Sequence, residues 1–221
     1  MSPFGVSSHD KYWLLPLAAG SFALVEADQR ILRHFGSTPL AHSGSLSDFG
    51  IAALAGGGAA FYLSGIAGSD AHRREAGLLT GEAAVNSVIV GEAMKLIFQR
   101  PRPTEKDAGR FGAGGASFPS EHALAAWSMA TVIAHEYPGP MTKLLAYGAA
   151  TGISLARVAD RKHFPSDVVV GSALGYLIGR YVYREHHDPE LAGAGVIEFL
   201  ENETQKPEKA FLSAFLEKWP V

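Results

Sequence analysis

Apolar segments separated by short polar breaks run along most of the chain, and their length is the first structural signal. Most are longer than a β-strand and contain few β-branched residues, which favours helices. Pro101 and Pro103 end one such segment. Ser69-Asp70 and Ser120 stand where helix N-caps are expected. The pattern predicts helices over residues 11–33, 48–67, 70–99, 120–135, 141–159 and 166–185. The expected fold class is therefore all-α, a bundle of about six core helices.

The composition changes near the end of the chain, where apolar segments give way to a polar tail. We expect residues 1–185 to form one helical-bundle domain and residues 186–221 to form the tail. Residues 210–219 (AFLSAFLEKW) are compatible with a short amphipathic helix, because their apolar side chains recur at helical spacing. His186, His187 and Asp188 open the tail, and we interpret them as polar tail residues rather than metal ligands.

Hydropathy does not decide whether the chain spans a membrane. Residues 49–68 are uncharged and long enough to span one, but glycine and alanine dilute their hydrophobicity. Residues 77–98 carry Glu82, Glu92 and Lys95, whose charges are costly against lipid. The mean hydropathy of the whole chain is only +0.08. We therefore favour a mainly soluble domain, with a membrane-embedded bundle as the alternative.

Charge and cysteine content exclude several classes of function. The formal net charge is −3, so no overall basic field exists to attract nucleic acid, and a nucleic-acid partner is not expected. The absence of cysteine excludes disulfides, thiolate metal sites and cysteine nucleophiles. Any anion site must therefore be built from a local group of arginines and lysines.

Unusual side chains gather in three blocks at predicted helix ends: KLIFQRPRP over 95–103, FPSEH over 118–122 and ARVADRKHFPSD over 156–167. Taken singly, each block has an ordinary structural explanation, such as a helix cap or a solvated loop. Together, Lys95, Arg102, Arg157 and the Ser120 hydroxyl are the parts of an anion cradle beside a helix N-terminus. His122, His163 and Asp167, which lie in the same blocks, add a nucleophile, a proton donor and an orienting carboxylate. Phosphoryl transfer requires this set, so an active site at the helix termini is expected.

The order and spacing of these residues resemble those of a known family. K-x-x-x-x-x-x-R-P (95–103), P-S-x-H (119–122) and R-x-x-x-x-x-H-x-x-x-D (157–167) are similar to the three motifs of the type 2 phosphatidic acid phosphatase superfamily. That superfamily includes bacterial acid phosphatases, lipid phosphate phosphatases and vanadium haloperoxidases. The resemblance implies an all-helical fold and a phosphatase that uses no metal cofactor.

The resemblance also implies a role for each matching residue. His163 would be the nucleophile and form a phosphohistidine, and Asp167 would orient its imidazole. His122 would protonate the leaving oxygen and then activate water. The phosphoryl oxygens would be held by Lys95, Arg102, Arg157, Ser120 and the backbone N–H of Glu121.

Two positions depart from the family pattern. Glu121 stands where the family often has glycine, and its carboxylate is expected to point away from the phosphate. Ala156 replaces a frequent serine, which removes one supporting hydrogen bond and leaves the main roles intact.

The resemblance further implies a phosphorylated small molecule or lipid as substrate, in the cell envelope, either periplasmic or membrane-associated. Vanadate is expected to act as an inhibitor, and the sequence leaves homo-oligomerisation open. One alternative is a vanadium haloperoxidase with vanadate as cofactor, although such enzymes are generally much larger than 221 residues. Another is a non-catalytic module that binds phospholipid or phosphoglycan, which would not need His122, His163 and Asp167 intact.

Overall fold

The computed structural model describes residues 11–34, 42–189 and 191, and all regular structure within them is helical. The bounds are α1 Lys11–His34, α2 Ser43–Ala67, α3 Ala71–Phe98, α4 Glu121–Glu136, α5 Pro140–Ala159 and α6 Pro165–His186. The predicted all-α bundle of about six helices is confirmed. The helix considered for residues 210–219 lies outside the described residues.

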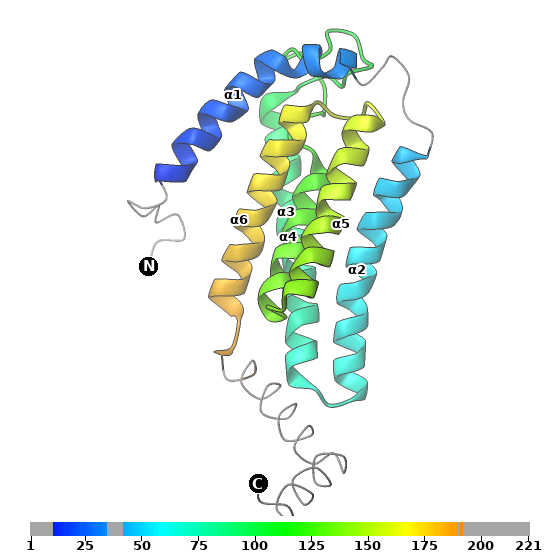
Figure 1. Ribbon diagram of the computed structural model, residues 1–221, viewed down its shortest axis with the longest axis vertical. Helices are drawn as coiled ribbons and strands as arrows, with labels where there is room; N and C mark the ends of the chain where they lie inside the picture. Colours follow the sequence, from blue (N-terminus) through cyan, green and yellow to red (C-terminus); the bar gives the residue numbers. More distant parts are fainter. Residues whose placement is uncertain (1–10, 35–41, 190, 192–221) are drawn as a thin grey trace, which may run out of the picture.

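Helices α2 to α6 run side by side along the long axis, and α1 leans across one end of them (Figure 1). The five bundle helices alternate in direction, so one end gathers the N-termini of α2, α4 and α6 with the C-termini of α3 and α5. The loop over residues 99–120 lies at this same end. Helix α4 forms the centre of the bundle, because eleven of its sixteen residues are buried.

Close contact between α4 and α6 depends on glycines spaced four residues apart on α6. A Cβ atom added to Gly175 would lie 2.2 Å from the carbonyl oxygen of Leu124, and one added to Gly179 would lie 2.3 Å from that of Ser128. Gly171 approaches the carbonyl oxygen of Ser120 in the same way. The missing side chains therefore let the two backbones approach each other and place the N-termini of both helices side by side.

Helix α2 has an exposed apolar surface. Among the described helices, α2 is long and apolar enough to cross a membrane, and only 11% of its apolar window is buried in the bundle. It begins at Ser43, five residues before the start that the apolar pattern predicts. Ser47 and Asp48, near the start of this helix, both contact Arg157.

Candidate active site

His163 lies in the turn between α5 and α6, and its side chain is only 3% exposed. Its Nδ1 atom lies 2.7 Å from the carbonyl oxygen of Ser117. Because a carbonyl only accepts hydrogen bonds, Nδ1 carries the proton and Nε2 of the neutral ring holds a free lone pair. Burial lowers the pKa of His163 below its ordinary value, and Asp167 partly opposes that shift. The ring is thus fixed in the tautomer that a nucleophile at Nε2 needs.

Asp167 lies in the first turn of α6, with Oδ2 3.8 Å from His163 Nδ1. This distance is too long for a hydrogen bond but short enough for strong attraction in a buried site. The carboxylate is held in place by the N–H of Phe164 at 2.9 Å, by the hydroxyl of Ser117 and by Nη1 of Arg100 at 2.5 Å. Asp167 is therefore a fixed negative charge that stabilises positive charge on His163.

Arg100 is a fully buried cation that the sequence reasoning did not assign. Its Nη2 atom donates to Asp28 of α1 at 2.8 Å, and Nη1 donates to the hydroxyl of Ser166 at 2.8 Å as well as to Asp167. Asp28 in turn accepts from the backbone N–H of Ser166 at 2.9 Å. This network ties α1 and the loop after α3 to the first turn of α6, and so holds Asp167 in place.

His122 lies in the first turn of α4 and points its Nε2 atom at Asp48, 2.9 Å away. Because an ionised carboxylate only accepts, this nitrogen carries the proton. His122 also lies within electrostatic range of Arg157 and His163. The Nε2 nitrogen of His122 therefore carries a proton of the kind that a general acid needs, and Asp48 holds it in place.

Arg157 and Ser120 carry buried polar atoms that have no hydrogen-bond partner within the described residues. These atoms are Nε of Arg157 and the hydroxyl oxygen of Ser120. Nη1 of Arg157 does bond, to Ser47 Oγ at 3.0 Å and to Asp48 Oδ1 at 3.3 Å. Ser120 precedes α4 without capping it through its side chain, and the first N–H groups of a helix have no partner inside the helix. Unpartnered donors of this kind beside a helix N-terminus are chemically suited to hold an anion.

The prediction that Glu121 points away from the phosphate-binding cations is wrong. Its carboxylate accepts a short hydrogen bond from Lys95, which also pairs with Glu92 at 2.7 Å. Arg102 lies close enough to Arg157 for the two positive charges to repel each other. Two of the three cations therefore already pair with carboxylates: Lys95 with Glu92 and Glu121, and Arg157 with Asp48.

The structure brings all eight predicted site residues to one end of the bundle. These are Lys95, Arg102, Ser120, Glu121, His122, Arg157, His163 and Asp167. Sequence reasoning missed three residues that complete the arrangement, namely Asp28, Asp48 and Arg100. Arg100 lies inside the first block, residues 95–103, and this position could have marked it as a site residue. Asp28 and Asp48 lie in segments where no motif marks them.

Comparison with known proteins agrees with this arrangement. The family model of the PAP2 superfamily matches residues 76–189, just over half of the chain. A lipid A 1-phosphatase from Porphyromonas gingivalis is 32% identical over 93 residues, which cover 41% of this chain and 19% of that protein. The matching part therefore spans about a fifth of that relative.

The fold is also similar to a solved structure. The crystal structure of a transmembrane PAP2-type phosphatidylglycerolphosphate phosphatase from Bacillus subtilis matches with a TM-score of 0.55 and 20% identity. The match covers 79% of this chain and 97% of that one. Together with the three motifs and the family model, it leads to one conclusion: the chain belongs to the PAP2 superfamily.

Proposed function

We propose that the chain hydrolyses phosphate esters in two steps through a phosphohistidine. In the first step, Nε2 of His163 attacks phosphorus, the P–O bond to the leaving group breaks, and His122 gives its Nε2 proton to the leaving oxygen. In the second step, His122 takes a proton from water, whose oxygen attacks phosphorus and breaks the P–N bond. The observation that carries the proposal is the buried His163 ring, whose Nδ1 proton is bound to the Ser117 carbonyl so that Nε2 can react.

In this proposal the phosphoryl oxygens are neutralised by side chains rather than by a metal ion. Arg157 supports that role, because its Nε atom is buried without a partner among the described residues and is available to an oxyanion. The Ser120 hydroxyl is available in the same way. Preorganised donors of this kind stabilise the charge that develops in the transition state.

We infer that the substrate is a lipid phosphate. A largely apolar groove of about 740 Å³ runs between α5 and α6, lined by residues that include Leu155, Val168, Val169 and Tyr176. Its lining includes Val168, the residue directly after Asp167 in the first turn of α6. An acyl chain in this groove would place a phosphate headgroup at the same end of the bundle as His163. Both named relatives are phosphatases of lipid phosphates.

The outer surface of the bundle supports residence in a membrane of the cell envelope. Large apolar side chains are exposed on four of its helices: Leu63, Ile66, Val85, Ile89, Leu144, Leu145, Val169 and Tyr181. So much exposed apolar surface is unusual on a soluble monomer. Since the similar Bacillus subtilis structure is that of a transmembrane protein, we propose a membrane-embedded bundle instead of the soluble domain favoured by hydropathy.

A phosphate-release assay on the full chain in detergent tests the proposed mechanism. We expect hydrolysis of phosphatidic acid that vanadate inhibits, and loss of turnover by at least about 1,000-fold in His163→Ala. His186→Ala is the matched control, because His186 is exposed and is the last residue of α6, whereas Asp167 lies in the first turn of that helix. Turnover that persists in His163→Ala would contradict the phosphohistidine.

A further inference from the structure

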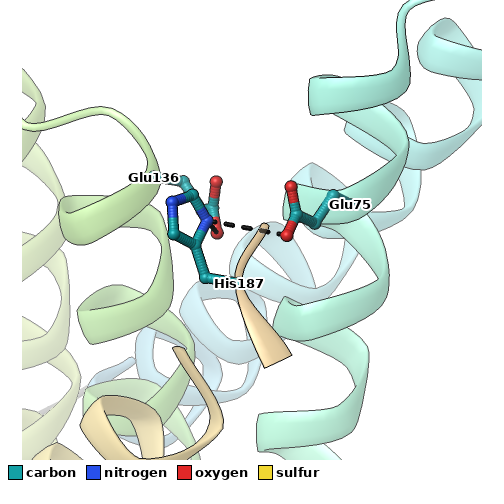
Figure 2. A group of neighbouring side chains, drawn as sticks. All are labelled: Glu75, Glu136 and His187. Carbon is teal, nitrogen blue, oxygen red and sulfur yellow. Dashed lines mark hydrogen bonds and ion pairs between the residues drawn. The ribbon is translucent and has the colours of Figure 1, made fainter. Parts of the chain in front are cut away.

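A second group of ionisable side chains lies at the end of the bundle opposite the active site. Glu75 comes from the beginning of α3, Glu136 is the last residue of α4, and His187 follows directly after α6 (Figures 1 and 2). Figure 2 shows the three side chains pointing toward one another from these separate helices. The side chain of His187, which the sequence analysis places in a polar tail starting at residue 186, is only 11% exposed.

The distances within this group are short. Nδ1 of His187 lies 3.1 Å from Oε1 of Glu136 and 3.6 Å from Oε1 of Glu75. One ligand atom from each of the three residues lies within 4.8 Å of the other two. His72 holds the second carboxylate oxygen of Glu136, with Nε2 at 2.9 Å from Oε2. The group is therefore a compact set of two carboxylates and one imidazole, with a second imidazole behind it.

The carboxylates of Glu75 and Glu136 are buried, and burying their negative charge costs free energy unless a positive charge lies nearby. The side chain of Glu136 is completely buried and that of Glu75 is 10% exposed. Two carboxylates this close repel each other, and each loses hydration. Oε2 of Glu75 is buried and has no hydrogen-bond partner within the described residues. A carboxylate oxygen in that position lacks the compensation that buried charges normally have.

We propose that Glu75, Glu136 and His187 bind one divalent transition-metal ion, with Zn²⁺ as the reference metal. Zinc bonds of about 2.1 Å at the tetrahedral angle put neighbouring ligand atoms about 3.4 Å apart. The two distances from His187 Nδ1, 3.1 and 3.6 Å, bracket that value. Imidazole and carboxylate ligands suit zinc and its neighbours in the first transition series.

His72 and the backbone support the same assignment. By bonding Oε2 of Glu136, His72 leaves Oε1 directed at the proposed ion, an arrangement common around metal-bound carboxylates. The N–H of Asp188 donates to Oε1 of Glu75 and restrains that side chain. The ion would join the ends of α3, α4 and α6, far from the phosphate cradle, so its role is structural and separate from hydrolysis.

Metal content and thermal stability of the purified full chain test the proposal. The protein is prepared in detergent without a polyhistidine tag, stripped with EDTA and reloaded with Zn²⁺. We expect about one zinc per chain, and a rise in Tm of about 5 °C at a zinc concentration 100 times Kd. Glu75→Gln and His187→Ala are expected to weaken zinc binding by at least about tenfold.

His186→Ala is the matched control, because His186 is the neighbouring histidine, is exposed and pairs with Glu82 at 2.9 Å. It should bind zinc like the unaltered chain. Zinc binding that survives unchanged in Glu75→Gln and His187→Ala would overturn the proposal, as would an unaltered chain that neither retains zinc nor gains stability from it. If the variants fail to fold, X-ray absorption of the zinc-loaded chain decides between one imidazole with two carboxylates and any other ligand set.

Discussion

At the scale of single residues, the burial of His163 is expected to set the pH range of the proposed activity. Burial lowers the pKa of this imidazole, so the neutral nucleophilic form persists to lower pH than for an exposed histidine with a pKa of about 6.5. Asp167 acts in the opposite direction and raises the pKa. We therefore expect Asp167→Asn to move the acid limb of kcat/KM to lower pH than in the unaltered enzyme. We also expect a fall in kcat of about 100-fold or more, because positive charge on His163 loses its partner.

The unaltered chain and Asp167→Asn act on the same phosphate substrate, so the ionisation of the substrate is the same in both. A difference between their pH profiles therefore reports the ionisation of His163. The pH dependence of kcat/KM, measured with one substrate from pH 4 to 8, checks the shift. An acid limb that stays in place or moves to higher pH in Asp167→Asn would show that another group controls it. Circular dichroism should accompany the kinetics, because Asp167 also pairs with Arg100.

Glu121 makes a second prediction at this scale. Its carboxylate accepts a hydrogen bond from Lys95 and brings negative charge to the proposed phosphate site. Glu121→Gln should remove one of the two carboxylate charges that pair with Lys95 and lower the inhibition constant of vanadate by roughly 3- to 10-fold, since the pair is partly exposed and screened by solvent. Vanadate inhibition curves at fixed pH measure the effect, and Glu82→Gln provides a distant control. Weaker vanadate inhibition in Glu121→Gln would mean that Glu121 positions Lys95 rather than competes for it.

Individual residues also show how far sequence reasoning reaches. His122, His163 and Asp167 could be named as candidates because their order and spacing within short blocks match the motifs of the family that the sequence resembles. Asp28 and Asp48 could not, because each becomes part of the site only through a contact across more than seventy positions of the chain. Such contacts depend on how the helices pack, which local patterns do not specify.

At the scale of the helices, the contact between α4 and α6 rests on the glycine spacing of α6. Gly175→Ala would place a methyl group 2.2 Å from the carbonyl oxygen of Leu124, so the two helices must move apart. We expect a loss of about 1–3 kcal/mol in the free energy of unfolding. Denaturant unfolding in detergent, followed by circular dichroism, measures this change.

Gly148→Ala is the matched control for that prediction. Gly148 lies in α5 and has nothing within 4 Å of an added Cβ, so alanine should stabilise the helix by about 0.5–1 kcal/mol. Opposite signs for the two substitutions are expected. Equal effects would mean that the close approach of α4 and α6 does not limit stability.

The apolar pattern was enough to predict each of the helices, but it was less accurate for the starts of α4 and α2. Asp70 caps α3 as predicted, with its side chain accepting from the N–H of Arg73 at 3.0 Å. The side chain of Ser120 does not cap α4, although serine at that position favours a cap. Helix α2 starts at Ser43, five residues before the predicted start at residue 48, and these added residues include Ser47, which bonds to Arg157 at the end of the bundle that holds the motif residues.

At the scale of the whole molecule, the two clusters of polar side chains lie at opposite ends of a bundle whose sides expose large apolar residues. The cradle lies at one end and the group of Glu75, Glu136 and His187 at the other. Mean hydropathy could not reveal this division, because it averages polar ends with apolar sides and cannot distinguish outward from inward apolar residues. His187 was missed for a related reason, since a polar stretch near a chain end looks solvated until the packing of α3 and α4 against it is known.

The groove between α5 and α6 leads to a prediction about this whole arrangement. If a lipid chain lies there, Ala173→Trp should fill the groove and exclude part of the chain. Each methylene kept from an apolar site costs about 0.8 kcal/mol, so losing two or three should lower kcat/KM for a long-chain lipid phosphate by roughly 10- to 50-fold. A short soluble phosphate ester uses only the cradle, and its kcat/KM should change less than about threefold.

The matched control is Ala149→Trp, which adds the same ring to an exposed position of α5 outside the groove. It should leave the ratio of kcat/KM for the long-chain lipid phosphate to kcat/KM for the short ester unchanged. Equal losses for both substrates in Ala173→Trp would place the lipid chain elsewhere on the bundle, while the role of His163 would stand on its own test.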